Sequence, residues 1–251
     1  MDTKLFDGKA FAQKIEAELK QKGVSAKLVS ILMGDNPASV LFLSLKQKAA
    51  ERVGAVLEIK KFEVNTLQEE IIHFIEVLNS DNSVKGIMIQ LPLPSGFDRE
   101  KIIGSISPEK DIDGMRDDSH FTAPVVMAIW AAITDSKIEL KEATIVGANG
   151  FVGKKLTAFL KEKGFRVTAV DIDSVDFEKA VKQASLLISA TGSSGLIKGS
   201  LIKGGAVVID VGSPKGDVER ASVERVASFL SPVPGGVGPL TIAYLMANLL
   251  Q

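Results

Sequence analysis

The sequence predicts an α/β protein whose parallel strands alternate with helices in two successive halves of the chain. Strand patterns and helix patterns alternate between residues 8 and 89. A polar, irregular segment at 107–124 interrupts this alternation, and the alternation begins again at residue 143. Strands separated by helices favour parallel sheets, because a parallel connection needs a long crossover. We therefore expect two α/β domains.

In the first half, specific residues mark the starts of two helices. Asn36 followed by Pro37 fits an N-cap and the first helical position. The segment Thr66–Glu69 has the spacing of a capping box. The predicted elements are a helix at 8–22, a strand at 27–33, a helix from 37 to about 53, a strand at about 55–62, a helix from 66 to about 79 and a strand at 86–89.

In the second half, the apolar segment Val125–Thr134 predicts a helix that connects the two domains. Strands and helices then alternate as far as a segment at 232–239 that is dense in proline and glycine. The predicted elements are strands at 143–147, 166–171, 185–190 and 205–211, and helices at 151–163, 176–183 and 240–250.

Composition excludes several classes of protein. The chain has 251 residues, a net charge of -1 and no basic block, so nucleic acid is not an expected partner. With no cysteine and only two histidines, the sequence predicts neither disulfides nor a metal site. The N-terminal segment lacks the apolar core of a signal peptide, and the longest apolar run, Ala123–Ile133, is too short to span a bilayer. We expect a cytoplasmic protein that binds no membrane.

The segment Thr144–Gly153 combines a strand, a glycine-rich turn and a helix start. Glycines let the backbone approach a pyrophosphate, and the helix N-terminus offers free N–H groups. Asp171 lies 24 residues after Gly147, where a carboxylate can accept hydrogen bonds from a ribose diol. The alternative is a tight turn that needs glycine. The pattern favours a dinucleotide site made of Gly147, Ala148, Asn149, Gly150, Phe151, Val152, Gly153 and Asp171.

Other candidates rest on weaker positional arguments. Phe42 and Lys46 lie four positions apart on the second predicted helix, so they share a face, but such a lysine most often keeps its head in water. Gln90 follows a buried strand, where open α/β sheets bind ligands, although a capped strand end is the more frequent role. Asp111 and Asp113 lie in a polar loop, where turn formation is the ordinary explanation.

The segment Ser231–Pro239 is so rich in proline and glycine that its backbone must follow a specific path beside a binding partner. The histidines and the tryptophan carry no such signal. We expect His73 to be a structural residue on the apolar face of its helix, Trp130 to lie in the core, and His120 to have no catalytic role.

Five ordered motifs are distributed along the chain between residues 34 and 241. They are Gly34–Ser39 with Lys46 after it, Gly86–Pro94, Lys110–Gly114, Lys203–Gly212 and Pro232–Thr241. Together they resemble the family of bifunctional methylenetetrahydrofolate dehydrogenases/methenyltetrahydrofolate cyclohydrolases. The motifs are long and occur in the order of the family, which leaves little room for coincidence.

The resemblance implies two α/β domains that face each other across a cleft, and a homodimer. Residues 1–120, joined by the final helix at 239–251, would form the catalytic, folate-binding domain. Residues 121–238 would form a Rossmann-like domain that binds NAD or NADP. The implied activity is oxidation of 5,10-methylene-tetrahydrofolate to the 5,10-methenyl compound, followed by its hydrolysis to 10-formyl-tetrahydrofolate.

The resemblance also implies roles for individual residues. Lys46 would be the catalytic lysine, Gln90 its hydrogen-bonding partner and Asp113 the carboxylate that holds the pterin. The substrate-binding residues would be Phe42, Pro234, Gly235 and Gly236. Thr191, Gly192, Gly212 and Thr241 would complete the cofactor-binding residues.

Two departures from the family bear on function. Phe42 stands where the family has a tyrosine, so its ring can stack on the substrate but cannot donate a hydrogen bond. Ala148 and Asn149 stand where the family has an arginine and a serine in the glycine turn. Because Asp171 and Asp173 would also face a 2′-phosphate, we expect NAD to be favoured over NADP.

Two alternatives compete with this interpretation. One is a folate- or dinucleotide-binding family member whose chemistry has lapsed, which Phe42 favours and the retained Lys46 opposes. The other is an unrelated Rossmann reductase that relies on a Tyr-x-x-x-Lys pair. The only tyrosine, Tyr244, is followed four positions later by Asn248, which excludes that pair.

Overall fold

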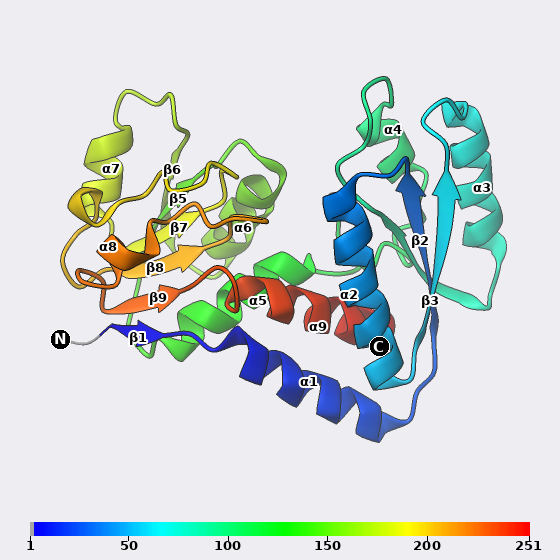
Figure 1. Cartoon of the computed structure of the whole chain (residues 1–251), viewed down its shortest axis with the longest axis horizontal. Helices are drawn as coiled ribbons and strands as arrows, with labels where there is room; N and C mark the ends of the chain where they lie inside the picture. The colour runs from blue at the N-terminus through cyan, green and yellow to red at the C-terminus, as the bar shows by residue number, and fades with distance from the viewer. Residues whose placement is uncertain (1–2) are drawn as a thin grey trace. The chain divides into compact units, whose positions relative to one another are not determined.

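The computed structural model describes residues 3–251 and comprises two compact units, each with a parallel sheet of its own (Figure 1). One unit contains residues up to Phe11 and Val125–Thr241. The other contains Ala12–Pro124 and Ile242–Gln251. The predicted class of two α/β domains is confirmed.

The unit that contains Ala12–Pro124 is built on a three-stranded sheet of order β3-β2-β4. Its strands are β2 (Lys27–Met33), β3 (Val56–Phe62) and β4 (Val84–Ile89), and its helices are α2 (Pro37–Val53), α3 (Gln68–Ser80) and α4 (Arg99–Gly104), with most of α1 (Gly8–Lys22) and α9 (Val237–Leu249). One core cluster joins the sheet to α2 and α9, and it includes Leu28, Met88, Leu43 and Met246. This packing fixes α2 against the end of β4.

The other unit is built on a six-stranded sheet of order β1-β9-β8-β7-β5-β6. Its strands, all parallel, are β1 (Lys4–Leu5), β5 (Glu142–Val146), β6 (Arg166–Val170), β7 (Leu186–Ser189), β8 (Val207–Asp210) and β9 (Phe229–Ser231). Its helical segments are α5 (Pro124–Asp135), α6 (Phe151–Glu162), α7 (Phe177–Gln183), η1 (Gly199–Leu201) and α8 (Arg220–Val223). Because β6 and β7 lie on opposite sides of β5, the chain order reverses beside β5, and open α/β sheets bind ligands at such a reversal.

The two helix starts predicted from capping residues can be compared with the structure. The side chain of Asn36 accepts hydrogen bonds from the backbone of Ala38 and Ser39, so the predicted N-cap of α2 is confirmed. The predicted capping box is wrong: α3 begins at Gln68, and its N-cap Leu67 makes no side-chain capping bond. Thr66 belongs instead to a preceding turn, because its N–H donates to the carbonyl of Glu63 at 3.1 Å.

Two further expectations differ from the structure. His73 is not on the buried face of α3; its side chain is 78% exposed and faces Glu76. Helix α9 begins at Val237, three residues earlier than expected, because Pro239 falls in the first turn, where a missing N–H breaks no helical bond.

The first strand pairs outside the half of the sequence in which it lies. Lys4 and Leu5 of β1 pair in parallel register with Phe229 and Leu230 of β9, so residues up to Phe11 belong to the six-stranded unit. Strands of two and three residues are too short to show alternation, and neither β1 nor β9 was predicted from the sequence.

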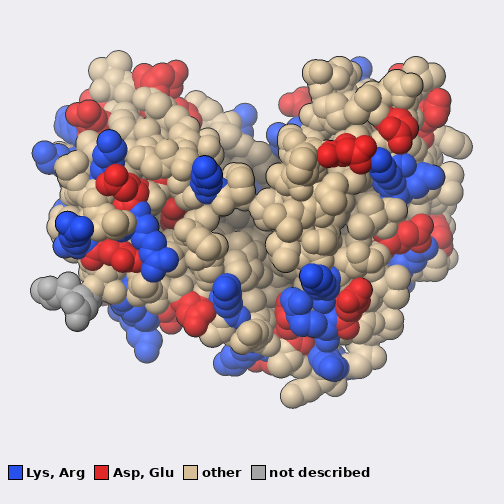
Figure 2. All heavy atoms as spheres, in the orientation of Figure 1, with Lys and Arg blue, Asp and Glu red and all other residues tan. Residues whose placement is uncertain are grey.

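The surface carries both signs of charge. On the face drawn in Figure 2, Lys and Arg side chains are interspersed with Asp and Glu side chains on each unit. Within residues 3–251, no helix meets the length and apolarity that crossing a membrane requires.

Candidate active site

Helix α2 and strand β4 bring Lys46 and Gln90 together. The amine Nζ of Lys46 lies 3.1 Å from Oε1 of Gln90. The other end of that amide, Nε2, donates to the carbonyl of Leu91 at 2.8 Å, which turns Oε1 toward the lysine. Gln90 is buried directly after β4, and its backbone N–H continues the ladder to Ile31 of β2. The predicted pairing of Lys46 with Gln90 is therefore present in the geometry.

Met88 is a third member of this contact that spacing alone did not predict. Its thioether Sδ lies 3.1 Å from Nζ of Lys46, and the residue is fully buried. Met88 and Gln90 are two positions apart on an extended segment, so both side chains point to the same face of the sheet. That alternation was the available signal. A thioether is a weak acceptor, so it gives the ammonium form little support.

Asp113 lies close enough to Lys46 for their charges to interact. Burial lowers the pKa of Lys46, and the charge of Asp113 opposes that shift. Burial raises the pKa of Asp113, and the charge of Lys46 opposes that shift. Both groups are therefore displaced toward their neutral forms, as is common where acid–base chemistry takes place.

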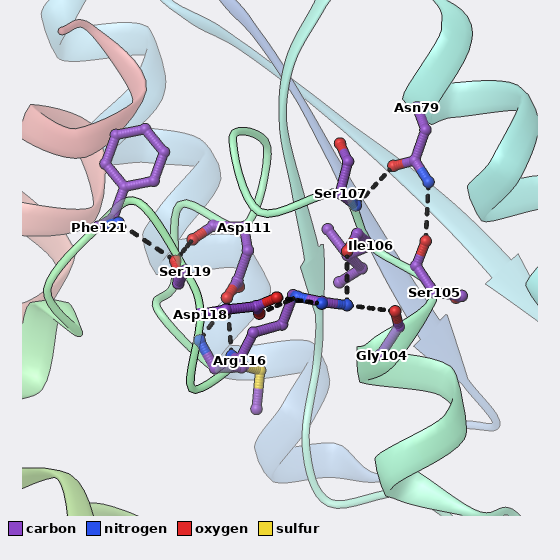
Figure 3. A network of polar contacts seen from close by, with 11 residues as sticks. Asn79, Gly104, Ser105, Ile106, Ser107, Asp111, Arg116, Asp118, Ser119 and Phe121 are labelled. Carbon is purple, nitrogen blue, oxygen red and sulfur yellow. Dashed lines mark hydrogen bonds and ion pairs between the residues drawn. The ribbon is translucent and has the colours of Figure 1, made fainter.

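The loop that carries Asp113 is held by the neighbouring carboxylate (Figure 3). Asp111 is fully buried, and its carboxylate accepts hydrogen bonds from the backbone N–H groups of Met115 at 3.1 Å and Arg116 at 2.8 Å. Its carbonyl accepts a bond from the hydroxyl of Ser119 at 2.9 Å. Asp111 therefore forms the turn, which was the ordinary explanation, and leaves Asp113 as the ligand-facing candidate.

The guanidinium of Arg116 also holds this loop, by hydrogen bonds to the residues where the loop begins (Figure 3). It donates to the carbonyls of Gly104 and Ile106, where the loop begins. It also forms two bonds of 2.7 Å with the carboxylate of Asp118. The side chain of Arg116 thus connects the part of the loop after Asp113 to the backbone at Gly104 and Ile106 before it.

Replacing Arg116 with alanine should loosen this loop. The Arg116 side chain, which bonds the two carbonyls, is only 18% exposed. Asp118 is 62% exposed, so its ion pair with Arg116 contributes less to stability than the bonds to the carbonyls. We expect a loss of about 1–2 kcal/mol in the free energy of unfolding. We also expect a higher KM for the folate substrate. Chemical denaturation of Arg116→Ala beside Arg166→Ala, whose side chain is 82% exposed, checks this. Equal losses in the two variants would contradict it.

Phe42 lies one helical turn before Lys46 and is half-buried. If the ring contacts the substrate by stacking, Phe42→Ala should weaken folate binding by about 1–3 kcal/mol, roughly 5- to 150-fold. Phe42→Tyr should bind folate as well as the wild type and hydrolyse the methenyl compound as fast or faster. Titration of folate binding measures the affinity of both variants, and an assay of methenyl hydrolysis measures the rate of Phe42→Tyr. Leu41→Ala, at a neighbouring exposed residue, is the matched control. Unchanged affinity in Phe42→Ala would make the ring a packing residue only.

In the six-stranded unit, the glycine turn follows β5 beside the reversal of chain order. Gly147 has a φ of 84°, and a Cβ there would lie 2.5 Å from the carbonyl of Ala190. A Cβ on Gly153 would lie 2.2 Å from the carbonyl of Gly147, so glycine lets α6 pack against the turn. Gly150 is the N-cap of α6 and has no side chain to fill the space before the helix. This cradle fits the pyrophosphate of a dinucleotide.

The other candidate cofactor residues divide into two groups. Thr191 and Gly192 follow β7, and Gly212 follows β8, so they share the carboxyl edge of the sheet with the glycine turn. Asp171 follows β6, where its backbone N–H donates to the hydroxyl of Ser174 at 2.8 Å. Thr241 differs, because its hydroxyl donates to the carbonyl of Val237 within α9.

The proline- and glycine-rich segment is shaped by close backbone contacts. Gly235 has a φ of 103°, and Gly236 donates its N–H to the carbonyl of Pro232 at 2.8 Å. A Cβ on Gly236 would lie 2.3 Å from the hydroxyl of Ser231. Pro234, Gly235 and Gly236 belong to the six-stranded unit, whereas Lys46, Gln90 and Asp113 belong to the other.

A glycine turn at the reversal of a parallel sheet, in a chain with a second α/β unit, is typical of dinucleotide-dependent enzymes. Two family models match the chain. Residues 6–113 match the catalytic domain of tetrahydrofolate dehydrogenase/cyclohydrolase, and residues 121–251 match its NAD(P)-binding domain. The chain therefore belongs to the tetrahydrofolate dehydrogenase/cyclohydrolase family.

Individual relatives agree with this family. The chain is 38% identical to the bifunctional protein FolD of Staphylococcus carnosus, over 100% of this chain and 96% of that protein. It is similar to the FolD crystal structure from Campylobacter jejuni, with a TM-score of 0.92, 36% identity and coverage of 99% and 97%. The Trypanosoma brucei FolD, solved with NADP and an inhibitor, gives a TM-score of 0.92 at 29% identity, covering 100% and 97%.

The predicted family is confirmed, and with it the activity. The protein is an enzyme that oxidises 5,10-methylene-tetrahydrofolate with a nicotinamide dinucleotide and hydrolyses the methenyl product. Nothing in these relatives favours the alternative of a binding protein with lapsed chemistry.

Proposed function

We propose that Lys46, Gln90 and Asp113 form the catalytic site, with Lys46 needed mainly for the hydrolytic step, and that the enzyme uses NAD in preference to NADP. The observation that carries the proposal is the contact of 3.1 Å between the amine of Lys46 and the amide oxygen of Gln90, beside the charge of Asp113. We assign folate to the unit that contains these three side chains and the dinucleotide to the six-stranded unit. The folate contact of Phe42, which lies in the same unit as these side chains, belongs to the same proposal.

In the hydrolytic step, Lys46 acts as the base. A water oxygen bonds to the methenyl carbon, and one of the water protons passes to Nζ of Lys46. The bond from that carbon to N5 then breaks, the remaining hydroxyl proton is transferred to N5, and 10-formyl-tetrahydrofolate is left. The amine must be neutral to accept the water proton. The lowered pKa of Lys46 supports this role, because burial disfavours the ammonium form. Gln90 holds the amine in place through Oε1.

In the oxidation, the protein acts mainly by positioning. When bound, the nicotinamide ring supplies the acceptor for the hydride that leaves the methylene carbon. The carboxylate of Asp113 can accept hydrogen bonds from the pterin N–H groups, which fixes the orientation of the folate. The glycine cradle around Gly147 and Gly153 would hold the pyrophosphate against the start of α6.

The preference for NAD rests on the residues near the adenosine ribose. Ala148 lies in the glycine turn and offers no positive charge to a 2′-phosphate. Asp171 and Asp173 follow β6, where one carboxylate can bind the free ribose hydroxyls of NAD. Comparing the rate at which each dinucleotide is reduced with methylene-tetrahydrofolate, and then the rate of methenyl hydrolysis, tests the proposal directly.

The homodimer that the resemblance implies is part of the same proposal. Strand β6 is at one edge of the six-stranded sheet, and Arg166, Thr168 and Ala169 along it are exposed. An exposed strand edge offers unpaired backbone groups to a second chain, which supports association of two copies.

A further inference from the structure

Two buried carboxylates in the six-stranded unit have no part in the chemistry described above. Asp210 is 2% exposed and Asp217 is fully buried. Within residues 3–251, neither forms a salt bridge with a lysine or arginine. Burying a carboxylate without a cation is costly unless hydrogen bonds replace the lost water. The location of those hydrogen bonds therefore indicates what the two residues do.

Asp217 binds the end of β7. Its Oδ2 accepts a bond from the hydroxyl of Ser189 at 2.8 Å and another from the backbone N–H of Thr191 at 2.7 Å. Its Oδ1 is buried without a hydrogen-bond partner. All of the polar contact is thus directed at the segment that begins the Thr191–Gly192 turn.

Asp210 binds the loop that carries Asp217. Its Oδ1 accepts bonds from the backbone of Gly212 at 2.9 Å and Asp217 at 3.0 Å, and its Oδ2 accepts one from Val218 at 3.1 Å. Burial raises the pKa of Asp210 to about 6, while these backbone bonds act in the opposite direction. The loop wraps closely, because a Cβ on Gly216 would lie 2.3 Å from Oδ2 of Asp210.

The two carboxylates connect the ends of β7 and β8. Gly212, Thr191 and Gly192 lie at this edge and are among the cofactor-binding residues that the family resemblance implies. A shift of their backbone by about 1 Å is enough to impair the alignment of a reacting cofactor. We propose that Asp217, held in place by Asp210, is a positioning residue that sets the Thr191–Gly192 turn for the dinucleotide. This inference rests on the proposed cofactor site.

Substitution of Asp217 tests the inference, because hydrolysis of the methenyl compound uses no dinucleotide. Asp217→Ala removes the acceptor and should raise the KM for NAD by about 10-fold or more, with methenyl hydrolysis unchanged. In Asp217→Asn, the amide oxygen can replace Oδ2 and its NH₂ can take the place of the unpartnered Oδ1. This variant should keep its KM within about 3-fold of the wild type. Asp176→Asn, at an exposed residue of the same unit, is the matched control.

Ser189→Ala provides a milder variant if Asp217→Ala does not fold. It removes one of the two bonds and should raise the KM for NAD by a smaller factor without affecting hydrolysis. An unchanged KM, or an equal loss of oxidation and hydrolysis, would overturn the inference in either variant. Amide hydrogen exchange of the wild type with and without NAD distinguishes a failure of the proposed cofactor site from a failure of the role of Asp217. Absence of protection at 190–193 and 211–213 would refute the cofactor site itself. Protection there with an unchanged KM in the variants would refute only the role of Asp217.

Discussion

Lys46→Met should abolish hydrolysis of methenyl-tetrahydrofolate while the variant still binds folate. Methionine keeps an unbranched stem of similar length beside Met88 and Gln90 but has no group that can accept a proton. A positioned general base typically contributes about 10²- to 10⁴-fold, so we expect a loss of about 10³-fold in the hydrolytic rate. Oxidation should fall less, because that step does not need an activated water molecule.

The control for this variant is Lys48→Met, on the same helix but with an exposed side chain. It should hydrolyse the methenyl compound at the wild-type rate. Folate binding, measured by titration, should be retained in both variants. Normal hydrolysis in Lys46→Met would remove the lysine from the mechanism.

The pH dependence of hydrolysis provides a second readout for Lys46. Only the neutral amine can accept a proton, so the rate should fall as the pH drops below the pKa of Lys46. Burial lowers that pKa, which keeps the base active at a lower pH than an exposed lysine allows. The charge of Asp113 acts in the opposite direction. In Asp113→Asn the acid limb of the residual activity should therefore move to lower pH.

Local signals in the sequence were sufficient for most of the regular elements. Asn36–Pro37 marks the start of α2 because capping is decided by residues next to each other. Thr66 shows the limit of this reasoning, since its N–H is used by the turn with Glu63 and not by α3. Pairing of β1 with β9 joins residues more than two hundred positions apart, and no local pattern contains that contact.

Some features of the candidate site could likewise be predicted from the sequence, whereas others depend on the folded structure. The helical spacing of Phe42 and Lys46 and the position of Gln90 after β4 could be read from the chain, and the family motifs then gave them roles. The orientation of the Gln90 amide and the approach of Met88 depend on how α2 packs against β4. The pKa shifts of Lys46 and Asp113 depend on burial, which is a property of the folded unit. The contacts of Asp210 and Asp217 also depend on the fold, because the spacing of residues along the chain does not predict that Asp217 binds the backbone of Thr191.

The second large effect that we expect is a reversal of cofactor preference in Ala148→Arg with Asp171→Ser. In the wild type, a dianionic 2′-phosphate would approach Asp171 and Asp173 with no guanidinium from the glycine turn. Each charged contact that is absent costs on the order of 1–3 kcal/mol. Like-charge repulsion adds to this loss, so kcat/KM with NADP should be lower than with NAD by about 10-fold or more.

The double variant changes both causes of the preference at once, namely the missing guanidinium at position 148 and the carboxylate at position 171. Arginine at position 148 supplies a planar donor set for the phosphate, and serine at position 171 removes a carboxylate while it keeps a hydroxyl. The arginine should raise kcat/KM with NADP, and the loss of the Asp171 carboxylate should lower kcat/KM with NAD, because the ribose diol loses a charged acceptor. Each single substitution shows how much of the change comes from attraction and how much from relief of repulsion. The measurement is kcat/KM with both dinucleotides for the wild type, the two single variants and the double variant. Equal or better use of NADP by the wild type would refute the preference, whatever the variants do.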